Sequence, residues 1–145
     1  MDTAEARVML LAIALQESRF EYRAQIRGPA RGYWQFERGG GTTGVVMHYA
    51  TSGNAVDIAD LLDYDMTGDA THCVDVIHAA LADNGLLAAC WARLLLWTDP
   101  YALPSIDDPS GAWDLYIRTW RPGKPHLGTW YDLHRQAVEQ IRSES

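Results

Sequence analysis

The sequence predicts an all-α fold, and three observations lead to that prediction. Apolar residues recur at helical spacing through most of the chain. Strand-like alternation of apolar and polar residues is nearly absent, so at most one small hairpin is expected, around Tyr33 to Glu37. Glycine, proline and Asp- or Asn-containing turns separate the periodic segments, as at helix ends. With 145 residues the chain fits one domain, residues 1–145, around a single core.

The first helix is expected from about Thr3 to Arg19. Asp2 is the candidate N-cap, and Glu5 three residues later would complete a capping box. The stretch Val8 to Leu15 is apolar on every face. This pattern predicts a helix that is buried all round, at the centre of the fold.

A polar, glycine-rich stretch follows the first helix, from Glu21 to Gly44. Turn-forming residues dominate it, including Gly32 and the run Gly39-Gly40-Gly41, so it is expected to be loop and a flexible wall of any cleft. Thr42 or Thr43 is expected to cap the helix that follows.

Six further helices are expected after this loop. They are a short helix from Thr43 to Tyr49, one marked by Ala55, Ile58, Ala59 and Leu62, one marked by Val74, Ile77, Ala80 and Leu81, one from Leu86 to Trp97, one opened by Asp108-Pro109, and one from Trp130 to Arg142 with Thr129 as its cap.

Aromatic residues gather near the end of the chain. Trp113, Tyr116 and Trp120 form one stripe of the predicted helix after Asp108, and Trp130 follows. We expect these rings in the core, with a sugar-binding platform as the alternative. The basic turn from Trp120 to Pro125 would border a groove or bind a partner.

Charge and hydropathy exclude several classes of protein. The net charge of −7 disfavours a nucleic-acid-binding protein. The longest apolar run, Val8 to Leu15, is far shorter than the roughly 18 residues that a membrane span requires. Asp2 and Glu5 stand where a signal peptide carries lysines, and no cleavage site follows the run. We therefore expect synthesis in the cytoplasm without a signal peptide.

No metal or cofactor is expected. His72, Cys73 and His78 do not form a ligand set, because neighbouring residues of a helix face different directions and a fourth ligand is not evident. Cys73 and Cys90 are expected to be reduced, buried thiols rather than a disulfide, given the cytoplasmic origin.

Glu17 is an unusual residue, because it continues the face of the apolar first helix. It lies four residues after Ile13 and seven after Leu10, so the three side chains point the same way. Burial at the end of an apolar helix raises the pKa of a carboxyl group. An acid that stays protonated near neutrality is what cleavage of a glycosidic bond requires. The alternative is a solvated residue in a last helical turn.

Residues 16–35 read QESRFEYRAQIRGPARGYWQ. This segment resembles the signature of soluble lytic transglycosylases and goose-type lysozymes, in which E-S-x-aromatic precedes an A-x-G-L-M-Q segment. The interval between the two parts is similar to the usual transglycosylase spacing, and the match covers only the N-terminal part of the chain. The matching residues are Glu17, Ser18 and Phe20 in the first part and Ala30, Gly32 and Gln35 in the second.

The resemblance implies a lysozyme-like helical domain that cleaves peptidoglycan between N-acetylmuramic acid and N-acetylglucosamine. Glu17 would be the catalytic acid, Ser18 its polar neighbour, and Gln35 a residue that lines the sugar cleft. Tyr33 and Trp34 stand where the family usually has Leu and Met. They would make the cleft wall more aromatic, unless they belong to the core.

The sequence also departs from the transglycosylase pattern. The segment ending in Met-Pro and the later Y-N-A-G motif are missing, whereas Gln35-Phe36-Glu37 resembles the Q-V-D of goose-type lysozymes, whose acidic residue helps hold the attacking water. Glu37 is therefore the candidate second carboxylate. Hydrolysis with inversion is favoured, with transglycosylation by Glu17 alone as the alternative. Further candidates for the cleft are Thr42, His48 and Tyr101, the last from its place in chain order.

Peptidoglycan glycan strands are thus the expected partner, and the protein is expected to be a monomer. A phage endolysin or a virion-associated lysozyme, acting on the bacterial cell wall after release, would fit these features. A non-catalytic cell-wall-binding or virion structural module and a chitinase-like enzyme stay open as alternatives. One tension is that cell-wall glycan is itself mostly anionic, as is this chain.

Overall fold

The computed structural model describes residues 1–25 and 27–145, and this part of the chain is all-helical, as predicted. Among its helices, none combines the length and the apolar character that crossing a bilayer requires. The elements in chain order are α1 (Ala4–Ser18), the π-type turn η1 (Arg38–Thr42), α2 (Thr43–Met47), α3 (Ser52–Leu61), α4 (Ala70–Ala80), α5 (Gly85–Trp97), α6 (Pro109–Trp120) and α7 (Leu127–Ser143).

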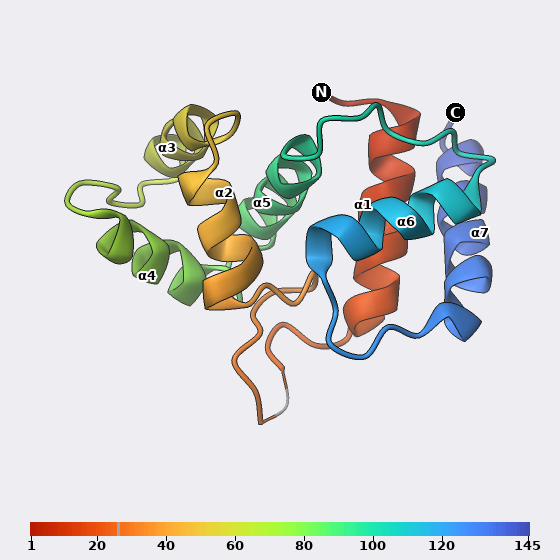
Figure 1. The fold of residues 1–145 in the computed structure, drawn as a ribbon, viewed down its shortest axis with the longest axis horizontal. Helices are drawn as coiled ribbons and strands as arrows, with labels where there is room; N and C mark the ends of the chain where they lie inside the picture. The colour runs from red at the N-terminus through yellow and green to blue at the C-terminus, as the bar shows by residue number, and fades with distance from the viewer. Residues whose placement is uncertain (26) are drawn as a thin grey trace.

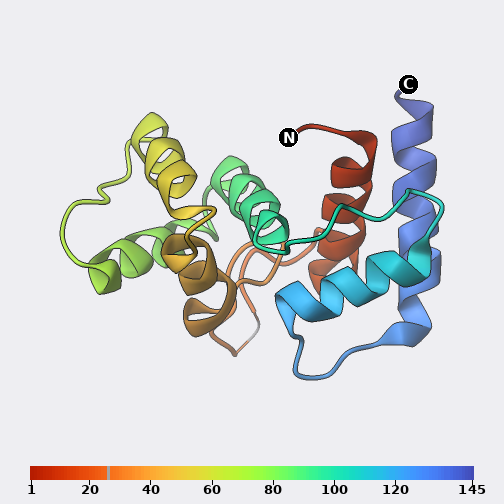
Figure 2. The ribbon, with the colours of Figure 1, turned by 45° about the horizontal axis from the view of Figure 1, so that its top comes forward.

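The helices form two groups with α5 between them (Figures 1 and 2). One group contains α1, α6 and α7, with α1 packed along α7. The other contains α2, α3 and α4. The loop of residues 19–37 joins the end of α1 to η1, so it connects one group to the other. We refer to these groups as the α1 group and the α2 group.

Helix α1 begins one residue later than its predicted cap implied. Thr3, not Asp2, is the N-cap, and its hydroxyl accepts a hydrogen bond from the Ala6 amide. Asp2 instead pairs with the exposed Arg7, because its side chain lies outside the first turn. Buried residues such as Met9 and Ile13 give the helix its apolar face, whereas its three leucines are only half-buried. The helix is therefore central but not buried all round.

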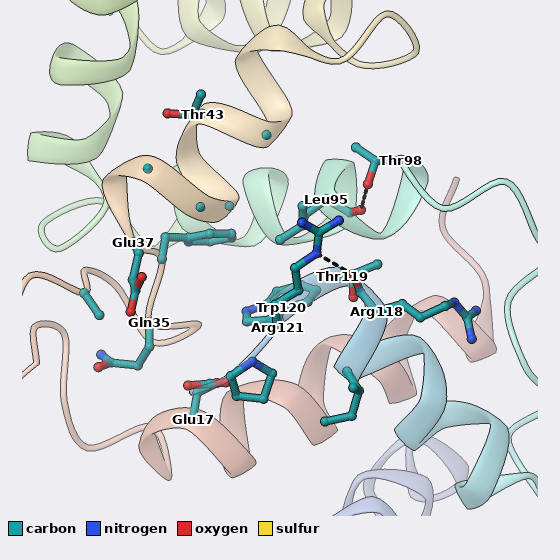
Figure 3. A pocket seen from close by; sticks show the side chains of 18 of the residues that line it. Glu17, Gln35, Glu37, Thr43, Leu95, Thr98, Arg118, Thr119, Trp120 and Arg121 are labelled. Atoms are coloured by element: carbon teal, nitrogen blue, oxygen red, sulfur yellow. Dashed lines mark hydrogen bonds between the residues drawn. The ribbon is translucent and has the colours of Figure 1, made fainter. Parts of the chain in front are cut away.

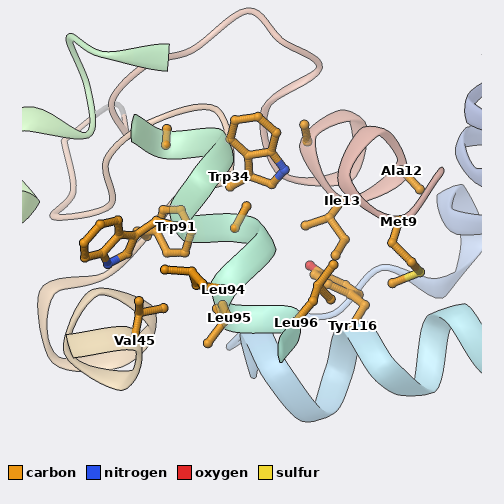
Figure 4. Close-up of a cluster of buried hydrophobic side chains, with 14 of the residues drawn as sticks. Met9, Ala12, Ile13, Trp34, Val45, Trp91, Leu94, Leu95, Leu96 and Tyr116 are labelled. Carbon is orange, nitrogen blue, oxygen red and sulfur yellow. The ribbon is translucent and has the colours of Figure 1, made fainter. Parts of the chain in front are cut away.

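One apolar core crosses both groups through α5 (Figure 4). Asn84 starts this helix by accepting a hydrogen bond from the Leu87 amide. Trp91 is fully buried on α5, and Figure 4 shows its ring near Val45 of the α2 group. Leu96, one and a half turns later, reaches toward the α1 group. Burial of each such side chain contributes about 2 kcal/mol, so α5 ties the groups together.

The last two helices differ in how well their starts could be predicted. Asp108 caps α6 by accepting from the Gly111 amide, with Pro109 as the first helical residue, as expected. Helix α7 begins at Leu127, three residues before the expected Trp130. Thr129 does not cap it: the Thr129 hydroxyl lies inside the helix and donates to the side-chain oxygen of Gln16 on α1.

The expected hairpin is reduced to one bridge between Arg31 and Phe36, within the described residues. Both backbone hydrogen bonds of that pair are made, at 2.9 Å. Gly32 opens the turn with a φ of +77°, in the left-handed region that favours glycine. A Cβ built on Gly32 would lie 2.9 Å from the carbonyl oxygen of Leu81.

Gly32→Ala should therefore destabilise the protein, by about 2 kcal/mol or more, because alanine adds both backbone strain and this close contact. Gly53→Ala is the matched control, since a Cβ at Gly53 of α3 meets nothing within 4 Å. Urea denaturation should show a lower midpoint for the first variant and an equal or higher midpoint for the second. Equal midpoints for both would contradict this account of the turn.

Candidate active site

A cavity of about 1170 Å³ opens between the α1 group and the α2 group. Glu17 at the end of α1, the turn η1 and helix α2, the end of α5 and the end of α6 all contribute to it (Figure 3). The side chains that matter for its chemistry are Glu17, Gln35, Glu37, Thr43, His48, Arg118, Trp120, Arg121 and Lys124.

Glu17 carries the most perturbed carboxyl group of this cavity. Its side chain is half-buried, and the Tyr116 hydroxyl donates a hydrogen bond of 2.6 Å to Oε1. The pKa of Glu17 is raised to about 7, mainly because the carboxyl group is buried. The hydrogen bond from Tyr116 offsets part of this rise, and the negative charge of Glu37 adds to it. The carboxyl is therefore about half protonated at neutral pH, and it can release a proton into the cavity.

Tyr116 contacts Glu17, although no role in the site was predicted for it from the sequence. Its ring belongs to the core, stacked on Trp130 at 5.2 Å between centroids and 5° between planes. Its hydroxyl reaches the Glu17 carboxyl group from below the cavity surface, and burial together with the charge of Glu17 raises the pKa of that hydroxyl. Tyr116 is thus a fixed donor at neutral pH. The available signal was that a buried tyrosine hydroxyl needs a partner.

Tyr116→Phe should raise the pKa of Glu17 further above 7, because the hydrogen bond that favours the charged carboxylate is lost. A bond to a charged group contributes about 1.5–3 kcal/mol, so we expect a rise of about one unit. A ¹³C NMR titration of the Glu17 carboxyl carbon measures it directly. Tyr131→Phe, which removes an exposed hydroxyl beside Ser110, should leave the titration unchanged. An unaltered midpoint in the first variant would refute the assigned role of Tyr116.

Gln35 and Glu37 line the same cavity on the loop of residues 19–37. Gln35 has a φ of 52°, and its side-chain amide donates to the Gly32 carbonyl at 2.9 Å, which fixes its direction. Glu37 is exposed, and Figure 3 shows its carboxylate on the same side of the cavity as Gln35, across from Glu17. Glu37 is near enough for its charge to raise the pKa of Glu17. The predicted pair of carboxyl groups therefore shares one cavity.

The opposite wall is the turn that follows α6. This basic turn was expected to border a groove or to bind a partner, and in the structure its residues line the cavity. The Trp120 indole N–H donates to the Trp34 carbonyl at 2.9 Å, and its ring contacts Phe36 at 5.9 Å between centroids. Arg121 and Lys124 add positive charge to the wall. A locally cationic wall favours an anionic ligand, although the protein as a whole is acidic.

The glycine run forms the wall contributed by η1. It forms a helical turn that is interrupted by a non-helical backbone conformation at Gly40, and a Cβ on Gly41 would lie 2.7 Å from the Phe36 ring. The absence of side chains there brings the backbone close to the core and keeps the cavity wide. Thr43 lines the cavity, and its hydroxyl donates to the Arg38 carbonyl.

His48 lines the cavity, as predicted for a residue soon after the glycine run. Its Nδ1 accepts from the Ala50 amide at 3.1 Å, which leaves Nε2 as the nitrogen that carries the proton when the ring is neutral. The ring stacks on exposed Tyr49, 4.5 Å between centroids. This pair forms an aromatic edge of the α2 group.

Three of the predicted cleft residues lie elsewhere. Trp34 is only 6% exposed, and its indole N–H donates to the Leu10 carbonyl, so it is a core residue that ties the loop to α1. The Ser18 hydroxyl is buried and donates to the carbonyls of Tyr33 and Ala14. Tyr33 is half-buried, and its own hydroxyl accepts from Arg23. These residues position Glu17 and Gln35 without lining the cavity.

Thr42 and Tyr101, also predicted to line the cleft, lie outside this cavity. Thr42 is fully buried and shares a hydrogen bond of 3.0 Å with His78 Nδ1, so it neither lines the cavity nor caps α2. The other candidate cap, Thr43, makes no capping bond either. Tyr101 is exposed on the segment after α5 and lines a different cavity. The tyrosine that contacts Glu17 is Tyr116.

No group of three or more His, Cys, Asp or Glu residues that could hold a metal ion occurs within residues 1–25 and 27–145. Cys73 is buried on α4 and Cys90 is half-buried on α5, both as free thiols. The cavity therefore offers acids, hydrogen-bond donors and aromatic rings as its chemical groups.

A scan against protein-family models and searches of curated proteins and solved structures found no match to this chain.

Proposed function

We propose that this chain is a peptidoglycan-cleaving glycosidase, with Glu17 as the general acid. The observation that carries the proposal is a half-buried carboxyl group, with a pKa of about 7, that opens into a cavity large enough for sugar rings. Such a group can protonate the oxygen that leaves C1 of N-acetylmuramic acid when the bond to N-acetylglucosamine breaks. The N-terminal sequence resemblance supports the same residue and the same role.

Glu37 supplies the second carboxylate that hydrolysis requires. It is exposed, and it faces the cavity across from Glu17. In this role it accepts a proton from a water that attacks C1 from the side opposite the leaving group, which inverts the configuration at that carbon. Gln35 lies beside it and would orient the sugar through its amide.

Transglycosylation is the second candidate for the same cavity. Within the described residues, the Glu37 carboxylate accepts no hydrogen bond, so its direction is less fixed than that of Glu17. With Glu37 turned to solvent, Glu17 would act alone, and the C6 hydroxyl of the muramyl residue would attack its own C1. The product would then be a 1,6-anhydro sugar.

Digestion of purified peptidoglycan tests the proposal. We expect the wild-type protein to release soluble muropeptides, and mass spectrometry to show reducing muramyl ends. Ends with a 1,6-anhydro bond would select transglycosylation instead. Protein that sediments with cell walls but releases nothing would overturn catalysis and favour a binding module. Cleavage of chitin oligomers without cleavage of peptidoglycan would favour the chitinase-like alternative.

A further inference from the structure

A second cavity, of about 450 Å³, lies beside the first at the end of α5. Asp99 and Pro100 line both cavities, so the two cavities adjoin at these residues. The Asp99 side chain is only 7% exposed and accepts two hydrogen bonds of 3.1 Å from the Arg118 guanidinium. This ion pair forms a fixed boundary between the cavities. It leaves the surface on each side open.

Two exposed aromatic residues line the second cavity. Trp97 is 45% exposed and Tyr101 is 72% exposed. Trp97 is the exposed member of the six tryptophans, all of which lie in the described part of the chain. Two exposed aromatic rings that line one cavity form a candidate binding surface. Aromatic faces suit the apolar faces of sugar rings.

Each of these rings makes a cation–π contact with an arginine. The Arg93 guanidinium lies 5.1 Å from the centroid of Trp97, and the Arg118 guanidinium lies 5.6 Å from that of Tyr101. The Arg93 Nε–H donates to the Met1 carbonyl, and within residues 1–25 and 27–145 its two terminal nitrogens make no hydrogen bond. An aromatic surface with guanidinium donors suits a sugar that carries carboxylates, whether on its lactyl group or on its stem peptide.

We propose that the second cavity is a distal binding site for the same glycan strand that occupies the Glu17 cavity. This inference rests on the proposed function for the identity of the strand. Trp97 and Tyr101 stack on a sugar ring beyond the Asp99–Arg118 boundary, and Arg93 pairs with a carboxylate of that unit. The site would make long strands better ligands than short oligomers. It would also attract the anionic polymer locally, although the chain has a net charge of −7.

The test compares binding of long and short glycans. Dissociation constants are measured by calorimetry for purified glycan strands and for a muropeptide tetrasaccharide, with all proteins in the Glu17→Gln background to prevent cleavage. The double variant Trp97→Ala/Tyr101→Ala should bind long strands about tenfold more weakly, as expected for truncation of a stacking contact. Its affinity for the tetrasaccharide should change by less than about twofold. Tyr131→Ala removes an exposed ring of α7 outside both cavities and is the matched control.

Each outcome separates the two proposals. Unchanged affinity of the double variant for long strands, or an equal loss for both ligands, would overturn the distal site and leave the proposed function intact. A selective loss for long strands in a protein whose wild type cleaves no peptidoglycan would retain the distal site and overturn catalysis. Absence of glycan binding by the parent protein would overturn both.

Arg93→Gln tests the charge contribution by itself. Compared with its parent protein, this variant should bind glycan strands with intact stem peptides more weakly. Its affinity for uncharged N-acetylglucosamine oligomers of equal length should equal that of the parent. An equal fall for both ligands would exclude a carboxylate as the group that Arg93 binds.

Discussion

Glu17→Gln should lower the rate of peptidoglycan cleavage by about a thousandfold, because the amide cannot give a proton to the leaving oxygen. The Gln oxygen can still accept the hydrogen bond from Tyr116, so the geometry around it is retained. We therefore expect kcat to fall while the affinity for cell walls changes little. Release of soluble muropeptides from labelled sacculi measures the first quantity, and cosedimentation measures the second.

The same variant should be more stable than the wild type in alkaline solution. The pKa of Glu17 is about 7 in the folded protein against 4.5 for an ordinary glutamate, so between these values the unfolded chain binds fewer protons than the folded one. The free energy of unfolding of the wild type therefore falls as pH rises from about 4.5 to about 7. Glutamine does not ionise, so the free energy of unfolding of Glu17→Gln should exceed that of the wild type by about 2 kcal/mol at pH 8. At pH 4 the two proteins should differ little.

Glu5→Gln provides the control for both measurements. It makes the same substitution at the opposite end of α1, in the first turn and away from the cavity. Cleavage should stay at the wild-type level, and stability should change by no more than about 0.5 kcal/mol. A Glu17→Gln variant that cleaves peptidoglycan at the wild-type rate would contradict the assignment of Glu17 as the general acid. A drop in its unfolding midpoint at pH 8 would show that the carboxylate is stabilised, not desolvated.

The parts of the site that could be predicted are those that local sequence places. Glu17 follows from the register of α1, since Ile13 is buried one turn before it. Gln35 and Glu37 come from a short loop that returns to the end of α1, as the motif spacing implied. Tyr116 could not be placed in this way, because it is separated from Glu17 by 99 positions and meets it only through the packing of α6.

The errors at Trp34 and Thr42 have a common physical cause. Both sit beside residues that do line the cavity, and alternate side chains of a turn point in opposite directions. The turn at Gly32 sends Trp34 into the core while Gln35, with its left-handed backbone, faces the cavity. Thr42 and Thr43 have helical backbone, in which neighbouring side chains also face different directions, so Thr42 is buried and Thr43 lines the cavity. A sequence shows which residues are neighbours in a loop but not which of two neighbours faces inward.

Helix starts show the same division between local and tertiary causes. The side-chain cap at Asp108 was predicted, because it satisfies an amide three residues on, and Asn84 caps α5 in the same way. The start of α7 could not be predicted, because its N-cap His126 makes no side-chain capping bond. Contacts between Gln16 of α1 and both Thr129 and the His126 carbonyl hold this first turn. Tertiary packing, not a local signal, sets that boundary.

Trp130→Ala should have the largest effect on stability, about 3–5 kcal/mol of destabilisation. Trp130 is fully buried on α7, its ring stacks on Tyr116 and contacts Trp113 edge-on at 5.6 Å, and its indole N–H donates to the Pro109 carbonyl. Alanine leaves a cavity and removes the hydrogen bond to the Pro109 carbonyl at the start of α6. Urea denaturation should show a large fall in the midpoint with an unchanged slope.

Trp130→Phe separates the packing of this ring from its consequence for the site. Phenylalanine keeps a face for Tyr116 to stack on but cannot donate to Pro109, so it should cost less than alanine, about 1–2 kcal/mol. Because Tyr116 carries the hydrogen bond to Glu17, loosening of its ring in Trp130→Ala should also raise the pKa of Glu17, in the direction of Tyr116→Phe. A destabilised Trp130→Ala protein in which Glu17 titrates as in the wild type would show that the stack supports the fold without positioning the acid.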